Sequence, residues 1–316
     1  MSINQTPLPT VFGLRKPLRD GRLFALLDAT SFAGLAQALA GSGMDHASLF
    51  RGDDAVLLEH EAPYICALDG TQPRAVRDLI ASALYRHAGF LIESDEDIDT
   101  LRRHYKNWLT VRLEETQEMV LFRFYDARIL LAFVGTLSTT EAAAFIGPST
   151  QLVALSETGQ ATALSLPGQQ PGIPSARFLK GSPYLITTQQ SDAFTEVTDT
   201  VFRKRAKAYL RTVFPDQAAD LPEEDMDELV AGAVADCDRL GVCREADVIS
   251  MAIARLLRPD LVASDAYWDA VVDQRPNPNQ RAGAFIAEIA HGMTPEERET
   301  FFARVNFWWD FGKEKP

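Results

Sequence analysis

The stretch Met119–Val134, with the sequence MVLFRFYDARILLAFV, changes its hydrophobic period in the middle. Over residues 119–125, apolar side chains occupy both faces of an extended chain, a pattern typical of a strand covered on both sides. Arg123 is the exception, because a charged group in such a strand needs a partner. Asp126 stands at an N-cap position, and residues 127–134 have the spacing of a short amphipathic helix. The stretch therefore predicts a central strand that runs directly into a helix.

The rest of the first half alternates short strand patterns with amphipathic helix patterns. The expected strands are 23–28, 55–59, 63–68, 89–94, 109–114, 119–125, 151–156 and 161–166. The expected helices are 32–39, 73–89, 94–105, 127–134 and 142–145. Several strands follow one another across short polar turns, which favours hairpins over regular β-α alternation. A mixed α/β domain with a largely antiparallel sheet is expected.

The segment 167–186 is rich in proline and glycine, and the periodicity changes after it. Apolar residues beyond the segment recur only at helical spacing, with a capping-box pattern at Thr294 before the last helix. The chain is therefore expected to be of the α+β class. We expect an extended lead-in at 1–20, a mixed α/β domain at 21–166, a linker at 167–186 and an all-helical lobe at 187–316.

The charge of the chain limits its partners. Its 316 residues are 46% hydrophobic, enough for a sizeable core, and its formal net charge is -13. Such an acidic chain is a poor match for a partner held mainly by phosphate contacts or for an anionic membrane surface. We therefore expect no nucleic-acid partner and no membrane insertion.

The three cysteines, Cys66, Cys237 and Cys243, are an odd set without C-x-x-C spacing, so neither a disulfide framework nor a zinc site is predicted. The sequence shows no apolar run of signal-peptide or membrane-span length. A soluble, cytoplasmic protein is the expectation.

Motifs for common chemistry are missing from the sequence. There is no Walker loop, G-x-G-x-x-G, G-x-S-x-G or H-E-x-x-H pattern, and we expect no cofactor and no metal site. Asp95, Asp97 and Asp99 have the opening spacing of a calcium loop, but Thr100 and Lys106 replace its required glycine and glutamate. Helix capping explains these aspartates better. The five histidines are scattered, and surface or satisfied core roles are favoured for them.

Two groups of residues are candidates for function. Arg123, Asp126 and Arg128 resemble a charged cluster at a strand end, where α/β proteins often bind ligands. A buried arginine paired with a carboxylate beside an N-cap aspartate explains the cluster without a substrate. The second group, Phe307-Trp308-Trp309, is a candidate partner contact, although aromatic residues at helical spacing usually close a core.

Four segments carry a resemblance to a known family: Leu26-Leu27-Asp28-Ala29, Ser48-Leu49-Phe50 before Gly52, Ala62-Pro63-Tyr64, and Leu121-Phe122-Arg123-Phe124-Tyr125-Asp126. In this order they resemble the type VI secretion effector-chaperone, or adaptor, family, catalogued as a domain of unknown function. The resemblance covers about residues 23–150. The helical second half is also similar to the C-terminal lobe of such adaptors.

The resemblance implies a non-enzymatic cytoplasmic protein that binds the N-terminal region of a toxic effector and helps to load it onto the VgrG spike or its PAAR tip. Arg123, Tyr125 and Asp126 match the family motif, either as scaffold or as effector contacts. A hydrolase or transferase that uses Arg123, Asp126 and Arg128 is an alternative, and so is a regulatory module that binds a small ligand.

Overall fold

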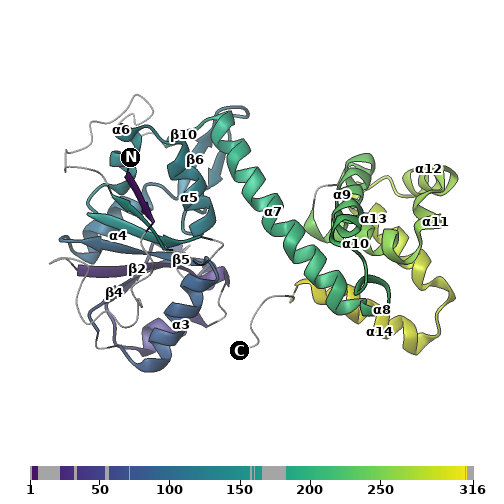
Figure 1. Cartoon of the computed structure of the whole chain (residues 1–316), viewed down its shortest axis with the longest axis horizontal. Helices are drawn as coiled ribbons and strands as arrows, with labels where there is room; N and C mark the ends of the chain where they lie inside the picture. Colours follow the sequence, from purple (N-terminus) through teal and green to yellow (C-terminus); the bar gives the residue numbers. More distant parts are fainter. Residues whose placement is uncertain are drawn as a thin grey trace. The chain divides into compact units, whose positions relative to one another are not determined.

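A computed structural model describes residues 2–5, 22–31, 34–53, 57–70, 72–156, 159, 161–165, 183–242, 244–309 and 311. The chain divides into two compact units, with the boundary between Val197 and Thr198. The predicted lead-in, apart from residues 2–5, lies outside the described residues, and so does the predicted linker over 167–182. The predicted fold class is confirmed, because a largely antiparallel sheet with helices is followed by a mostly helical region (Figure 1).

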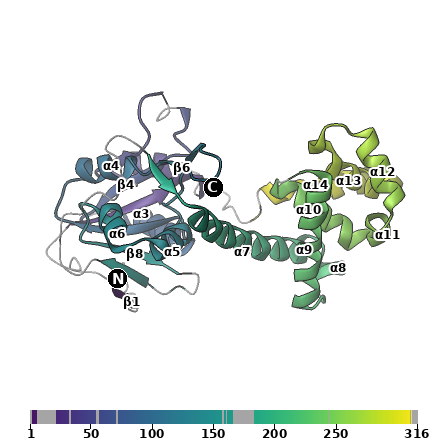
Figure 2. The same cartoon turned by 90° about the horizontal axis from the view of Figure 1, so that it is seen from above.

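A seven-stranded sheet forms the centre of the N-terminal unit (Figures 1 and 2). Its strands are β1 (Ser2–Gln5), β2 (Arg22–Asp28), β3 (His46–Ser48), β4 (Pro63–Leu68), β5 (Gly89–Ser94), β8 (Gln151–Leu155) and β9 (Ala161–Ser165). They lie in the order β1-β9-β8-β5-β2-β4-β3, and all neighbouring pairs are antiparallel. Strand β2 therefore lies between two long partners, β4 and β5.

Helices cover both faces of this sheet. Those described are η1 (Ala29–Ser31), α1 (Leu35–Gly41), α3 (Arg74–Tyr85), α4 (Ile98–Lys106), α5 (Ala127–Thr136) and α6 (Thr139–Ile146). Because side chains alternate along a strand, Ala25 and Leu27 of β2 pack with α1 and α3, whereas Phe24 and Leu26 face the core shared with α4, α5 and α6. Figure 1 shows α3 on one side of the sheet and α4, α5 and α6 on the other.

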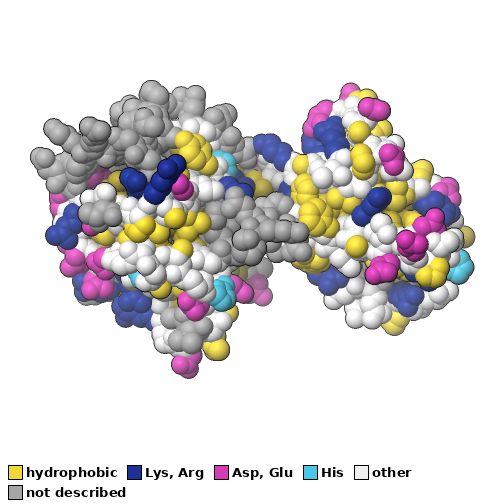
Figure 3. All heavy atoms as spheres, turned by 90° about the horizontal axis from the view of Figure 1, so that it is seen from below, with side chains coloured by type: hydrophobic (Ala, Val, Ile, Leu, Met, Phe, Trp, Pro, Cys, Tyr) yellow, Lys and Arg dark blue, Asp and Glu magenta, His cyan; other side chains and the backbone are white. Residues whose placement is uncertain are grey.

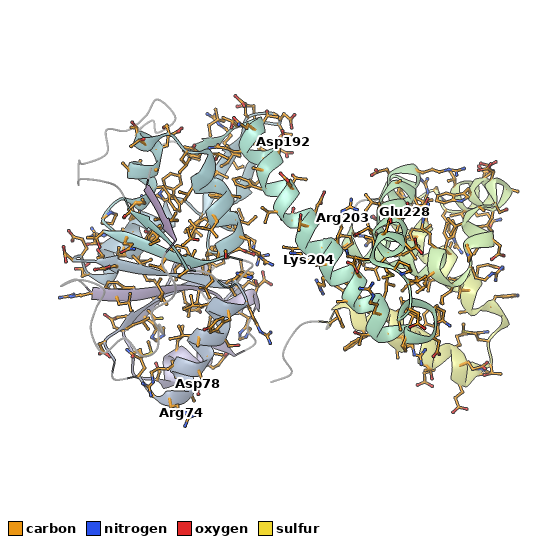
Figure 4. All side chains as sticks on the ribbon, in the orientation of Figure 1. Arg74, Asp78, Asp192, Arg203, Lys204 and Glu228 are labelled. Atoms are coloured by element: carbon orange, nitrogen blue, oxygen red, sulfur yellow. The ribbon has the colours of Figure 1, made fainter. Side chains whose placement is uncertain are left out.

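Local capping chemistry sets the beginnings of these helices. Asp97 caps α4 and accepts a hydrogen bond from the Thr100 amide at 2.8 Å, as the capping interpretation of the aspartate cluster predicts. Ser138 and Glu141 form the predicted capping box of α6. On the exposed face of α3, Arg74 and Asp78 form an ion pair one turn apart (Figure 4).

A second, three-stranded sheet corrects the prediction for the stretch at 119–134. Strands β6 (Thr110–Leu113), β7 (Met119–Leu121) and β10 (Tyr184–Ile186) lie in the order β10-β6-β7. The expected hairpin of β6 and β7 is present, but β7 is a three-residue edge strand rather than a central one. Residues 122–125 form a turn, because Phe122 and Phe124 leave the strand to join a cluster of aromatic rings.

Three further details differ from the sequence prediction. Residues 57–59, the described part of the strand predicted at 55–59, lie in no strand, and Leu57 is 79% exposed. Residues 2–5 form β1, which pairs with β9. Residues 184–186, expected within the linker, form β10, which pairs in parallel with β6. Edge pairing of this kind depends on partners distant in the chain and leaves no local signal.

Helices make up the C-terminal unit as far as its residues are described. Helix α7 (Thr188–Val213) begins in the N-terminal unit and continues into the C-terminal one, with Asp192 before the boundary and Arg203 and Lys204 after it (Figure 4). The following helices are α8 (Pro215–Ala218), α9 (Glu223–Leu240), α10 (Glu245–Leu257), α11 (Pro259–Val262), α12 (Asp265–Gln274), η2 (Pro278–Gln280), α13 (Arg281–Ile289), η3 (Ala290–Gly292), α14 (Pro295–Asn306) and η4 (Phe307–Trp309).

Helix α10 lies at the centre of this unit and packs against α9 and α13. Asp236 of α9 is buried and accepts two hydrogen bonds from Arg255 of α10, at 2.5 and 2.9 Å. Gly232 lies against this pair, and a Cβ atom there would lie 2.4 Å from the Arg255 guanidinium. An ion pair therefore joins two helices that are neighbours in the chain.

Among its described residues, each unit also holds one buried thiol. Cys66 lies in β4 and Cys237 in α9, and neither is in a disulfide. Burial raises the pKa of both thiols to about 12. Cys243 lies outside the described residues.

Among the described residues, no helix combines the length and the apolar character needed to cross a membrane.

Candidate functional site

The segments that carry the family resemblance meet at one end of β2. In the strand register Asp28 faces Pro63, and Ser48 faces Tyr64. The backbone amide of Ala29 donates to the Ala62 carbonyl at 3.3 Å, closing the end of the β2–β4 pair. The turn at 122–126 reaches the same place through a side-chain contact to Asp28. We call this junction of β2, β4 and the 122–126 turn the β2 corner.

An ion pair between Asp28 and Arg123 holds the β2 corner. The Asp28 carboxylate is 1% exposed, and its Oδ2 atom accepts a hydrogen bond from the Arg123 guanidinium at 2.5 Å. Its Oδ1 atom accepts from the amide and the hydroxyl of Thr30 at 3.0 and 2.7 Å. The same Arg123 nitrogen also donates to the Thr30 hydroxyl at 2.9 Å. A turn and a strand end, far apart in the chain, are thus tied by one guanidinium.

Arg123 is less buried than the sequence predicts, because half of its side-chain surface is exposed. The predicted partner carboxylate is present, but the buried member of the pair is the aspartate. Partial burial has the largest single effect and lowers the pKa of Arg123, but the charge and the hydrogen bond of Asp28, with smaller contributions from Tyr125 and Asp126, together raise it, so the net direction is upward. The guanidinium therefore stays charged, with one part bound to Asp28 and another part at the surface.

Tyr125 lies beneath Arg123. Its ring is 1% exposed, and the guanidinium carbon of Arg123 lies 5.9 Å from the ring centroid, within range of a cation–π contact. Burial, and then the charge of Asp28, raise the pKa of the Tyr125 phenol to about 12 against the opposing effect of Arg123. Tyr125 is thus a neutral, buried support for the guanidinium at physiological pH.

Asp126 has the predicted capping role at the beginning of α5. Its Oδ1 atom accepts from the Arg128 amide at 2.9 Å and from Arg128 Nε at 2.9 Å, while Oδ2 accepts from the Arg128 guanidinium at 2.5 Å. Asp126 and Arg128 therefore form a local cap and ion pair. The Asp126 amide also donates to the Arg123 carbonyl at 3.0 Å, which joins the cap to the turn.

The turn between α3 and β5 supports the corner from behind. Its residue His87 adopts a left-handed conformation with φ of 62°, which is uncommon for a residue with a side chain. The His87 carbonyl accepts from the Ala127 amide at 2.9 Å, and the next carbonyl, of Ala88, accepts from the Asp28 amide at 2.9 Å. Two successive carbonyls thus fix both α5 and the end of β2.

Arg102 of α4 holds the remaining motif segment in place. Its guanidinium donates to the backbone carbonyls of Ser48 and Phe50, at 2.6 and 3.2 Å. The Leu49 amide between them donates to the Pro63 carbonyl at 2.9 Å. The Ser48-Leu49-Phe50 segment is therefore fixed by α4 on one side and β4 on the other.

The corner has the chemistry of a tether. The carboxylate oxygens of Asp28 and Asp126 already accept bonds from Thr30, Arg123 and Arg128, so this arrangement does not present a free base or nucleophile in these residues. Over the described part of the chain, no group of three or more histidine, cysteine, aspartate or glutamate side chains is placed to hold a metal ion. These bonds favour the structural interpretation of the charged cluster over the catalytic one.

The second predicted group, Phe307-Trp308-Trp309, is divided by the fold. Trp308 is 1% exposed and packs against Phe202 and Tyr209, with the Arg205 guanidinium 4.0 Å from its ring centroid. The prediction of a surface contact is therefore wrong for Trp308. Phe307 and Trp309 are 40% and 56% exposed and remain candidate contacts. The group belongs to the C-terminal unit and is not part of the β2 corner.

Sequence reasoning did not identify Thr30, His87 and Arg102 as parts of the corner. Asp28 carried a signal, since an aspartate directly after an apolar strand segment needs a partner when the strand is central. Arg102 and His87 carried no such signal. Arg102 binds backbone carbonyl groups, and His87 acts through its own backbone carbonyl in a turn, so neither contact depends on a recognisable partner side chain.

The chain was compared with known proteins. No curated protein and no solved structure matches it. Residues 23–144, which include Asp28, Arg123 and the other bonded residues of the β2 corner, match the model of a family described as a domain of unknown function, DUF4123.

Proposed function

We propose that this protein is a non-enzymatic cytoplasmic adaptor that binds the N-terminal region of a type VI secretion effector and helps to load it onto the VgrG spike or its PAAR tip. The observation that carries the proposal is the convergence of the motif segments within residues 23–144 on one corner of the N-terminal sheet. Motif residues used for an internal tether are typical of a scaffold rather than of a catalytic centre.

Exposed apolar side chains support a protein-binding role. Large apolar residues more than one-third exposed occur in both units, namely Leu57, Leu58, Tyr85, Met119, Leu121, Val272, Phe307 and Trp309. Leu58 precedes β4 and Tyr85 precedes the His87 turn, so both lie in segments that lead into the β2 corner. In Figure 3, hydrophobic side chains reach the surface of both units among charged ones. Aromatic and methionine side chains of this kind are enriched at protein interfaces.

The experiment is co-expression with an effector encoded by a gene adjacent to this one. We expect a stable complex on size-exclusion chromatography, and loss of effector solubility or secretion when the adaptor gene is deleted. An effector that stays equally soluble and equally secreted after the deletion would refute the proposal. Purified protein is assayed in parallel, and turnover abolished by alanine at Arg123, Asp126 and Arg128, with folding retained, would favour the enzyme alternative.

A further inference from the structure

Strand β7 has an edge without a partner strand among the described residues. It is the last strand in the order β10-β6-β7, and Met119 and Leu121 are 51% and 53% exposed. The other edge strands whose side chains are described, β3 and β10, have half-buried or buried side chains. Of these edges, β7 alone presents large exposed apolar residues.

The hydrogen bonds of the hairpin show which backbone groups of β7 face β6 and which point away from it. The Leu113 amide donates to the Glu118 carbonyl at 2.9 Å, and the Phe122 amide donates to the Leu109 carbonyl at 2.8 Å. In an antiparallel pair the bonded positions alternate, so Val120 also faces β6, whereas the amides and carbonyls of Met119 and Leu121 point away from it. These outward groups can pair with a further strand.

Side chains at the same positions extend the free edge. Met119 and Leu121 lie on one face of the sheet, while Val120 lies on the opposite face and packs against the core. An added strand would therefore place every second side chain beside Met119 and Leu121. Apolar residues at alternate positions fit this surface, as in other complexes formed by strand addition.

The negative charge at the β6–β7 turn favours an added strand that carries a basic residue. Glu114, Glu115 and Glu118 lie in or beside the turn, and Arg112 is the only basic residue between 110 and 121. All three glutamates are exposed. A lysine or arginine at the end of the added strand nearest the turn would be electrostatically favoured there.

We propose that the β7 edge binds an extended segment of the effector as an added strand, with apolar side chains at alternate positions and a basic residue beside the acidic turn. This inference rests on the proposed adaptor function and names the surface and the kind of segment that it uses. Pairing with Met119 and Leu121 supplies backbone hydrogen bonds, and the alternating side chains supply specificity.

Amide hydrogen exchange of the full-length protein, free and in complex with the co-expressed effector, tests the pairing directly. In the free protein we expect fast exchange at Met119 and Leu121 and slower exchange at Val120. In the complex, the first two amides are expected to slow by at least about tenfold. A complex that leaves both amides unchanged would overturn the inference while leaving the adaptor function intact; failure to form any complex would instead count against the adaptor function.

Leu121→Pro removes one outward amide without removing a hydrogen bond to β6, and Leu121→Thr is the matched control that keeps the amide. We expect the proline variant to weaken effector binding by about tenfold or more, and the threonine variant by clearly less. Equal losses in both variants, with normal folding, would contradict strand addition.

Charge reversal gives a second test that does not depend on the proline variant folding. Glu115→Lys/Glu118→Lys is expected to weaken binding, most strongly at low salt, whereas Asp95→Lys/Glu96→Lys, a matched pair of exposed residues elsewhere in the unit, is not. Equal effects of the two pairs would overturn the charge assignment. Sedimentation of the free protein tests for another occupant, and a dimer that Leu121→Pro dissociates would assign the edge to a second copy of the chain.

Discussion

Asp28 and Arg123 are 95 residues apart in the chain, whereas Asp236 and Arg255, the corresponding buried pair of the C-terminal unit, are 19 residues apart. In both pairs the aspartate is buried and the arginine is partly exposed. The first pair fixes an irregular turn to a strand end. The second joins two helices that also pack extensively against each other.

This difference indicates how each unit acquires its structure. The N-terminal unit depends on contacts between distant segments, such as β1 with β9 and β6 with β10. The C-terminal unit combines packing between sequence neighbours, such as α9 and α10, with fewer distant contacts, such as those of Trp308 with Phe202 and Tyr209. Contacts between distant segments carry a larger loop-closure cost, so the N-terminal unit is expected to fold more slowly and to depend more on individual ties.

Trp308→Ala is expected to have the largest effect and tests whether the C-terminal core is held by single large residues as well as by helix packing. Removal of this buried indole should lower the free energy of unfolding of the C-terminal unit by about 4 kcal/mol. The neighbouring exposed residue provides the control, and Trp309→Ala should change stability by less than about 0.5 kcal/mol. Urea unfolding followed by hydrogen exchange in each unit measures both. Similar costs would show that the assignment of core and surface is wrong.

Gly147→Ala is expected to cause the next largest loss of stability, and this loss falls on the N-terminal unit. Gly147 has φ of 56°, and a Cβ atom there would lie 2.2 Å from the ring of His104. The strained backbone and the overpacking together should cost about 3 kcal/mol. Gly232→Ala in the C-terminal unit is the matched change. Its Cβ would meet the end of the Arg255 side chain, which can move, so we expect a loss of stability of about 1 kcal/mol. Equal losses of melting temperature in Gly147→Ala and Gly232→Ala would contradict this distinction.

Arg123→Ala removes the tie between distant segments. Asp28 keeps its bonds from Thr30, and half of the arginine side chain is already exposed, so the expected loss is about 2 kcal/mol rather than the larger cost of a fully buried pair. Arg128→Ala removes a pair only two residues apart and should cost less than about 1 kcal/mol. The denaturant midpoints of Arg123→Ala and Arg128→Ala measure the two losses. Unchanged stability of Arg123→Ala with lost effector binding would make Arg123 an interface residue.

The smallest expected effect concerns pH and is confined to the N-terminal unit. Burial lowers the pKa of His104 from its ordinary value of 6.5, although the bond to the Phe145 carbonyl partly opposes this shift. Below pH 6.5 the unfolded chain therefore binds a proton that the folded chain does not. Stability should fall as the pH drops below 6.5, by up to about 1.4 kcal/mol per pH unit, and level off below the folded-state pKa.

The contribution of His104 is isolated by comparison with His104→Gln, which keeps a hydrogen-bond donor but does not titrate. Unfolding between about pH 8 and about pH 5 should show a steeper loss in the parent protein than in the variant. Identical pH profiles would mean that His104 is hydrated or protonated in the folded unit.

Local chemistry predicted much of the fold. Asp97, Asp126, Ser138 and Thr294 begin the helices that their patterns indicate, because a cap involves only the next few residues. The strand predicted at 119–125 is wrong after Leu121, because burial of Phe122 and Phe124 in a distant ring cluster outweighs their strand propensity.

Distant partners limited the prediction of the candidate site. The sequence indicated that Arg123 needed a carboxylate, but only the β2–β4–β5 pairing identifies Asp28 as that carboxylate. The prediction for Phe307, Trp308 and Trp309, directly after α14, was limited in a similar way. Their spacing did not distinguish Trp308 from Trp309, since the 3₁₀ turn η4 decides which ring points inward.

The two buried thiols can report how fast each unit opens. A thiol reagent attacks the thiolate, and with the pKa near 12 almost none is present at neutral pH until a unit opens. In a Cys243→Ser background, the rate of labelling at Cys66 therefore times the opening of the sheet unit, and the rate at Cys237 times the opening of the helical unit. One alkylation series read by mass spectrometry would give both lifetimes in the same molecule and show whether capture of a partner slows one of them or both.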